Sequence, residues 1–329
     1  MTRGYPFPLS VWALLGLLIA GLSYRHPTHA TSPDSLHYLR VATDWQAYDG
    51  TFPPGYSLLT WVTATLTQLP VLWASKLVNW LALGVFGWLW AGRVGPKRAG
   101  WLLTLWLLPG NLRIATYTWS ETVFVVGLLE TVWQLNQQKQ NRPNRVWLLL
   151  ALLPWVRYVG LFMFVRRVPA TSLIGAGLLL ALNLFLTNHL FGGPRLLPTE
   201  HLPDLFEMAT GAILNEFLLY NRPHSNPTVF WLALTGQAIS VVGLFLWLRR
   251  NGFFVETRNP LVRDLFRTGL LYFMVLFALR CLSPFDPLNE RLMLPGSICW
   301  LVGLVLAVQS QHSMMSRSPE RAEMRTNPS

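Results

Sequence analysis

Carboxylates and arginines, the residue types that can move protons and hold phosphate groups, stand at four separated places in this chain. The first is Asp34, which begins a polar stretch over residues 34–56 and is followed one helical turn later by His37 and Tyr38. The others are Glu121 after Trp119 and Ser120, the pair Arg157 and Tyr158, and the pair Glu290 and Arg291. A carboxylate can take a proton from an attacking hydroxyl, and a guanidinium binds phosphate through two parallel contacts. Brought together, these residues would suit a phosphate-bearing lipid substrate.

Each of these positions also has a purely structural explanation. Aspartate is favoured at a helix N-cap, which could account for Asp34. A carboxylate such as Glu121 is favoured at the start of a helix by the helix dipole. Arginine often anchors the end of a membrane span, which could account for Arg291. The spacing along the sequence leaves these alternatives open.

The composition predicts that membrane helices position these residues. The chain has 329 residues, of which 52% are hydrophobic and only 12% are charged, whereas soluble domains carry about 25% charged residues. Apolar stretches of spanning character therefore predict an all-α, polytopic bundle of about 10 spans. They lie at about 7–24, 71–92, 99–109, 121–136, 146–156, 158–166, 169–190, 228–248, 268–282 and 291–309. Residues 1–309 would form the membrane domain, and we expect a polar, disordered cytoplasmic tail over 310–329.

The distribution of charge predicts the orientation. Although the net charge of +11 would suit nucleic acid, the basic residues lie in short loops between apolar stretches, so membrane topology explains them and we exclude a nucleic-acid partner. One set of loops holds most of the Lys and Arg and is expected to be cytoplasmic. The other set holds most of the Asp and Glu, including Asp34 and Glu121, and would face outward.

Three further expectations follow from span lengths and order. If residues 93–98 are cytoplasmic, the stretch 55–70 cannot cross the membrane. Residues 25–70 then form one long outer loop, and 55–70 is a helix on the membrane surface. The alternative is that 55–70 is an ordinary membrane crossing. The stretches 99–109, 146–156 and 158–166 are too short to cross a hydrocarbon core of ~30 Å, so they predict broken helices. A continuous helix over 146–165 would instead bury Arg157 in the bilayer, at a cost of several kcal/mol.

Other features of the sequence carry no predicted chemistry. The apolar run 9–22 predicts an uncleaved first span rather than a signal peptide. Cys281 and Cys299 lie in apolar segments and are expected to be buried thiols. No internal repeat of the kind found in many transporters is evident.

The ordered set of motifs resembles the GT-C superfamily of polytopic glycosyltransferases. The matching pieces are Pro33-Asp34-Ser35-Leu36-His37-Tyr38, Pro53-Pro54-Gly55-Tyr56-Ser57-Leu58-Leu59, Ser120-Glu121, Arg157-Tyr158-Val159-Gly160-Leu161, and Glu290-Arg291 before Pro295. These pieces span residues 34–295. The most specific part is the combination of the first two pieces, Asp34 with Tyr38 followed by Pro53-Pro54-Gly55-Tyr56. The first motif, with Asp34-Ser35-Leu36-His37-Tyr38, looks most like that of the GPI-type mannosyltransferase branch and its bacterial relatives.

The resemblance implies transfer of a single sugar, a mannose-like hexose, from a polyprenyl-phosphate donor to a glycan, lipid or protein acceptor. It implies Asp34 as the catalytic carboxylate, with interfacial helices in the long first loop. His37, Tyr38, Glu121, Arg157, Tyr158, Glu290 and Arg291 are the expected substrate-binding residues. The expected location is the inner membrane of a bacterium, with the site on the outer face.

The sequence departs from many relatives in two ways. Asp34 is followed by Ser35 where many relatives have a second acid, so Asp44, Asp49 or Glu121 could assist. The chain is also short, which disfavours a self-sufficient oligosaccharyltransferase. Metal use varies in the superfamily, so a divalent metal stays an alternative, although no cluster of metal ligands is evident. A transporter or lipid flippase and a non-catalytic relative are the competing functions.

Overall fold

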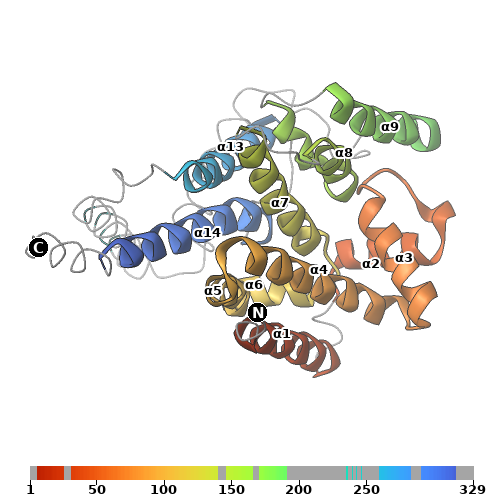
Figure 1. Ribbon diagram of the computed structural model, residues 1–329. Helices are drawn as coiled ribbons and strands as arrows, with labels where there is room; N and C mark the ends of the chain where they lie inside the picture. Colours follow the sequence, from red (N-terminus) through yellow and green to blue (C-terminus); the bar gives the residue numbers. More distant parts are fainter. Residues whose placement is uncertain are drawn as a thin grey trace, which may run out of the picture.

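The computed structural model describes residues 6–25, 31–139, 146–165, 170–190, 259–282 and 290–315, with single positions at 235, 239, 242 and 246. All regular secondary structure in these ranges is helical (Figure 1). The α-helices are α1 (Pro6–Arg25), α2 (Pro33–Thr43), α3 (Gly55–Thr67), α4 (Val71–Val94), α5 (Pro96–Thr104), α6 (Pro109–Thr116), α7 (Glu121–Lys139), α8 (Val146–Val156), α9 (Ala170–Thr187), α13 (Pro260–Leu282) and α14 (Glu290–Met315). Three 3₁₀ segments join them: η1 (Trp45–Ala47), η2 (Leu105–Leu107) and η3 (Tyr158–Val165).

Four of the described helices are long and apolar enough to cross a membrane: α1, α4, α9 and α14. This is fewer than the ten spans expected from the sequence. Helix α7 carries several charged and amide side chains, α13 has three charged residues among its first eight, and α8 has only 11 residues. The expected span 228–248 lies outside the continuously described residues. Helix α14 continues to Met315, past the expected boundary at 309.

The short apolar stretches over 99–109 and 146–166 are interrupted, the first at a proline and the second at an arginine. In place of a span at 99–109, α5 ends at Thr104 and α6 begins at Pro109, where the missing N–H of proline suits the first turn of a new helix. Helix α8 ends at Val156, and η3 begins at Tyr158. Arg157 therefore lies at a break in the helix, as expected, and a continuous helix over 146–165 is excluded.

Helices α2 and α3 lie side by side at one end of the molecule (Figure 1). Because α3 has 13 residues, it is about 20 Å long, which is too short to cross a hydrocarbon core of ~30 Å on its own. Its first residue, Gly55, packs so closely on α8 that a Cβ there would lie 2.4 Å from the carbonyl oxygen of Trp155. This contact joins the first loop to the broken helix that carries Arg157.

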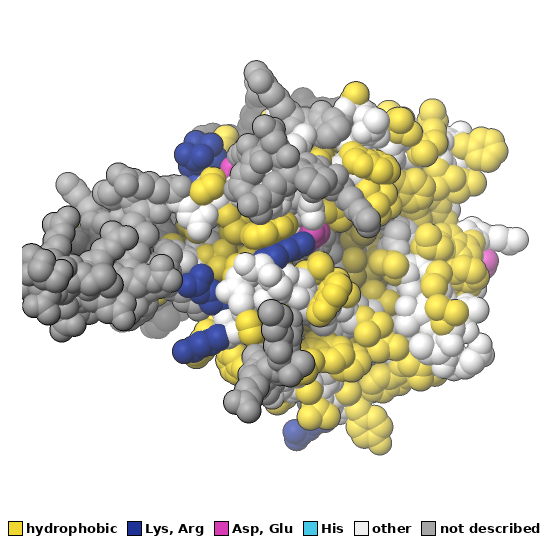
Figure 2. Space-filling view, in the orientation of Figure 1, with side chains coloured by type: hydrophobic (Ala, Val, Ile, Leu, Met, Phe, Trp, Pro, Cys, Tyr) yellow, Lys and Arg dark blue, Asp and Glu magenta, His cyan; other side chains and the backbone are white. Residues whose placement is uncertain are grey.

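Helix α7 is central and contacts α4, α6, α8, α13 and α14. Its apolar side chains, including Phe124 and Leu128, are fully buried in the main hydrophobic core. The outer surface is also strongly apolar, and hydrophobic side chains cover much of the described surface in Figure 2. Trp88 and Phe185 are 70% and 85% exposed, which suits a surface that meets lipid.

Candidate active site

Four charged side chains from distant parts of the chain meet in one cluster. Arg291 forms ion pairs with Asp34 and Glu121, and Arg157 forms a second ion pair with Glu121. They come from the start of α14, the first turn of α2, the start of α7, and the break between α8 and η3. The structure thus brings together one member of each of the four groups singled out in the sequence.

Burial divides this cluster into an inner and an outer part. The side chain of Glu121 is 0% exposed, whereas those of Asp34, Arg157 and Arg291 are 11%, 12% and 14% exposed. Two carboxylates and two guanidinium groups balance in charge, which is the condition under which buried ions are tolerated. Asp34, Arg157 and Arg291 therefore each keep a small exposed area, whereas Glu121 has none.

The segment 118–121, just before and at the start of α7, organises the site. Trp119 lies beneath Arg291, whose Cζ is 4.6 Å from the centroid of the indole ring. The indole N–H of Trp119 donates to Ser32 Oγ at 2.8 Å, and the Ser120 hydroxyl lies 2.9 Å from the hydroxyl of Tyr38. These contacts tie α7 to α2 and fix the guanidinium of Arg291 from a second side.

The geometry rules out one structural explanation for Asp34. Ser32, not Asp34, is the N-cap of α2, and its Oγ accepts a hydrogen bond from the Ser35 N–H at 3.1 Å. Asp34 lies in the first turn beyond the cap, and its carboxylate contacts Arg291 instead. Arg291 is likewise largely buried, and it forms ion pairs with two carboxylates.

Tyr38 lies behind the charge cluster rather than in its wall. Its side chain is buried, and its ring packs edge-on against Tyr56, with centroids 5.1 Å apart. Burial raises the pKa of Tyr38 above its usual range, and the negative charge of Glu121 adds to this effect. Tyr38 is therefore a neutral hydrogen-bonding group at physiological pH.

His37 and Tyr158 belong to a second polar group, centred on residues 44–52. His37 Nε2 lies 3.5 Å from Asp49 Oδ1, and its ring packs against Phe52. The Tyr158 hydroxyl donates to the Gly50 carbonyl at 2.8 Å and accepts from Asn183 Nδ2 at 2.8 Å. These contacts hold the loop over α9 and η3. Glu290 begins α14, but its side chain lies outside the description.

Lys76 is a buried cation that is not among the residues expected at the site. It lies on α4 with 3% exposure, and its ammonium donates to Thr118 Oγ1 at 2.8 Å. Thr118 is three residues before Glu121, so Lys76 supports the same segment that holds the charge cluster. A single charged residue inside the apolar stretch 71–92 is a recognised signal of function in membrane helices and could have identified it.

Within the described part of the chain, no group of three or more His, Cys, Asp and Glu side chains is placed to hold a metal ion. The chain matches no family model, no curated protein and no solved structure. The arrangement of the site is therefore the basis for a functional assignment.

Proposed function

We propose that this protein is a membrane glycosyltransferase that moves one hexose from a polyprenyl-phosphate donor to a hydroxyl of an acceptor. The observation that carries the proposal is the contact of Arg291 with Asp34 at the partly exposed side of a buried charge cluster. A base and a phosphate-binding cation stand side by side there, which is the pair of groups that such a transfer needs.

The proposed reaction is a single displacement. The acceptor oxygen attacks the anomeric carbon while the bond from that carbon to the phosphate oxygen breaks, and the polyprenyl phosphate leaves with the bonding electrons. The carboxylate of Asp34 takes the proton of the attacking hydroxyl. The guanidinium of Arg291 stabilises the negative charge that develops on the departing phosphate.

The ion pair also suggests how the base becomes available. In the structure, Arg291 binds Asp34, so the guanidinium occupies the carboxylate that would act as the base. An incoming donor phosphate competes for the same guanidinium, so that donor binding releases Asp34 at the moment when a base is needed. Glu121 and Arg157 hold Arg291 in place during the exchange and act as positioning residues.

Sugar transfer by the purified full-length chain tests the proposal. The donor is a radiolabelled polyprenyl-phosphate hexose, and membranes from cells that lack the protein supply the acceptor. Transfer is expected for the parent, with a loss of about 10²-fold or more for Asp34→Asn, the typical contribution of a general base. Glu130→Gln is the matched control, because it breaks the Arg93–Glu130 pair away from the site. Undiminished transfer by a folded Asp34→Asn protein would refute the role of Asp34.

A lipid flippase is the second candidate, and Lys76 is the observation that favours it. Cations buried within membrane helices are typical of substrate pathways in transporters. This function predicts movement of a labelled polyprenyl-phosphate sugar across proteoliposomes without transfer of the sugar. Formation of a glycosylated product by the purified protein would decide for the transferase.

A further inference from the structure

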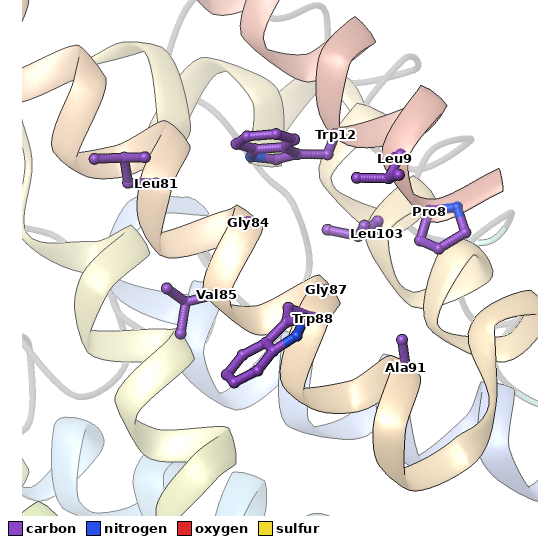
Figure 3. A pocket seen from close by; sticks show the side chains of 10 residues that line it. All are labelled: Pro8, Leu9, Trp12, Leu81, Gly84, Val85, Gly87, Trp88, Ala91 and Leu103. Carbon is purple, nitrogen blue, oxygen red and sulfur yellow. The ribbon is translucent and has the colours of Figure 1, made fainter. Parts of the chain in front are cut away.

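A cavity lies between α1, α4 and α5 and is lined by none of the residues of the charge cluster (Figure 3). Its volume is about 350 Å³, within the range of small-ligand sites. Every side chain in its lining is apolar or glycine. The lining residues are Pro8, Leu9, Trp12, Leu81, Gly84, Val85, Gly87, Trp88, Ala91 and Leu103. We refer to it as the α1–α4 groove.

The walls of this groove are fixed by an unusual contact between α1 and α4. Trp12 and Trp80 stack with their ring centroids 4.2 Å apart, and each indole N–H donates to the backbone carbonyl of the other residue, at 2.9 and 3.0 Å. Gly84 permits the close approach of Trp12, because a Cβ there would lie 2.8 Å from the indole ring. The groove is therefore a preformed feature of the packing.

The groove opens to the outside of the bundle. Leu9, Val85 and Trp88 are 55%, 49% and 70% exposed although all three line it. Both α1 and α4 are apolar enough to cross a membrane. A cavity between two such helices that has no polar lining would take a hydrocarbon chain rather than a polar ligand.

Positive charge marks one end of the groove. Lys97 and Arg98 begin α5, between the lining residues Ala91 and Leu103 in the chain. Gly100 of α5 packs directly on Phe7, which precedes the lining residues Pro8 and Leu9 of α1. Lys97 is exposed and Arg98 is partly exposed, and both precede Gly100 by less than one helical turn. The start of α5 that carries them therefore lies next to the beginning of α1.

We propose that the α1–α4 groove binds one anionic phospholipid, with an acyl chain along the groove and the headgroup phosphate on Lys97 and Arg98. The lipid comes from the leaflet on the side of the basic loops, which is the cytoplasmic one by the positive-inside rule. Anionic lipids are attracted to such basic positions next to membrane helices. This site is separate from the charge cluster and does not depend on the proposed transferase activity.

Native mass spectrometry of the full-length protein in detergent, with phosphatidylglycerol or phosphatidylcholine added, tests the site. The parent is expected to retain one phosphatidylglycerol in preference to phosphatidylcholine. Val85→Trp should fill the groove and reduce retention at least 10-fold. Ile174→Trp is the matched control, since Ile174 is an exposed β-branched residue on α9, outside the groove, and it should retain lipid like the parent.

A second variant separates the two parts of the proposed site. Lys97→Gln with Arg98→Gln should keep a bound lipid but lose the preference for the anionic headgroup. Equal retention by Val85→Trp and Ile174→Trp would overturn the proposal, as would equal retention of the two lipids by the parent. A lipid-independent dimer that Val85→Trp dissociates would also overturn it, because the occupant would then be a second copy of the chain.

Discussion

At the scale of single residues, the site depends on the balance of four charges. Glu121 has no exposure and holds two guanidinium groups, so its own charge is the least replaceable of the four. Removing one partner from a buried ion pair leaves the other charge without compensation, which costs far more than removing both. The effects of substituting the four side chains one at a time are therefore not expected to add up to the stability of the whole cluster.

A double-mutant cycle tests this interdependence. Glu121→Gln should lower the free energy of unfolding by about 3–5 kcal/mol, because it leaves an excess positive charge in a buried site. Adding Arg157→Gln restores the balance, so the double variant should be less destabilised than the sum of the single variants by about 0.5–3 kcal/mol. Denaturation in mild detergent measures all three. Strict additivity would show that the two side chains act independently.

Tyr38 provides a pH-dependent test. Tyrosine in an unfolded chain titrates near pH 10, and burial raises the pKa of Tyr38 in the folded protein above that value. As the pH rises above about 10, the unfolded chain releases a proton that the folded protein retains. The stability associated with Tyr38 is thus complete below this pH and is lost as the pH rises toward the folded pKa.

The measurement is the unfolding temperature of the parent and of Tyr38→Phe between pH 8 and pH 11. The parent should lose more stability than the variant over this interval, since phenylalanine has no proton to lose. Identical pH profiles would show that Tyr38 titrates normally in the folded protein. The comparison cancels the titration of other groups, which both proteins share.

At the scale of helices, the site depends on where α2, α7, α8 and α14 begin or end. Its four charged side chains lie at or next to these termini. Ser32 shows how a terminus is fixed, because its Oγ accepts from both the Ser35 N–H and the indole of Trp119. Capping by Ser32 leaves the carboxylate of Asp34 available for Arg291.

Replacing the cap should therefore affect both stability and the site. Ser32→Ala is expected to lower the free energy of unfolding by about 1 kcal/mol, the usual contribution of an N-cap. Ser32→Thr keeps a hydroxyl and is the control, with a smaller loss expected. Thermal unfolding in detergent distinguishes the two, and an equal effect of both substitutions would mean that the side-chain cap contributes little.

At the scale of the whole molecule, the helices of the first loop and most of the basic side chains lie in different parts of the structure. Helices α2 and α3 lie at one end and the C-terminal part of α14 reaches the other, and the Lys and Arg side chains visible in Figure 2 lie on the α14 side of α2 and α3. Orientation by the positive-inside rule would place α2 and α3 outside. Helix α3 is too short to cross the membrane on its own, so it does not reverse the orientation of the helices that follow it.

Cysteine labelling tests the proposed orientation. In a background with Cys281→Ser and Cys299→Ala, an added Asp49→Cys or Gln68→Cys should react with a membrane-impermeant maleimide from outside intact cells. Lys97→Cys should react only after the membrane is opened. Residues 49 and 68 flank α3, so labelling of only one of them from outside would mean that α3 crosses the membrane after all.

Much of the local structure could be predicted from the sequence because it depends on neighbouring residues. Apolar length predicted α1, α4, α9 and α14, and the charge of Arg157 predicted the break after α8. A broken helix was also predicted for 99–109, but the sequence did not show that a further helix, α6, begins at Pro109. Lys76 was missed, since its apolar neighbours outweigh one charge in any average over a span.

The sequence by itself determined that this chain is built of apolar helices and which carboxylates and arginines could do chemistry, because hydropathy and residue type are local properties. Only the tertiary structure decided that Arg291 contacts Asp34 and Glu121, that Ser32 rather than Asp34 caps α2, and that His37 and Tyr158 belong to another polar group. These contacts depend on how the helices pack. The ion pairs among them also have to compensate the cost of removing charged groups from water. Residue spacing along the chain carries no information about that balance.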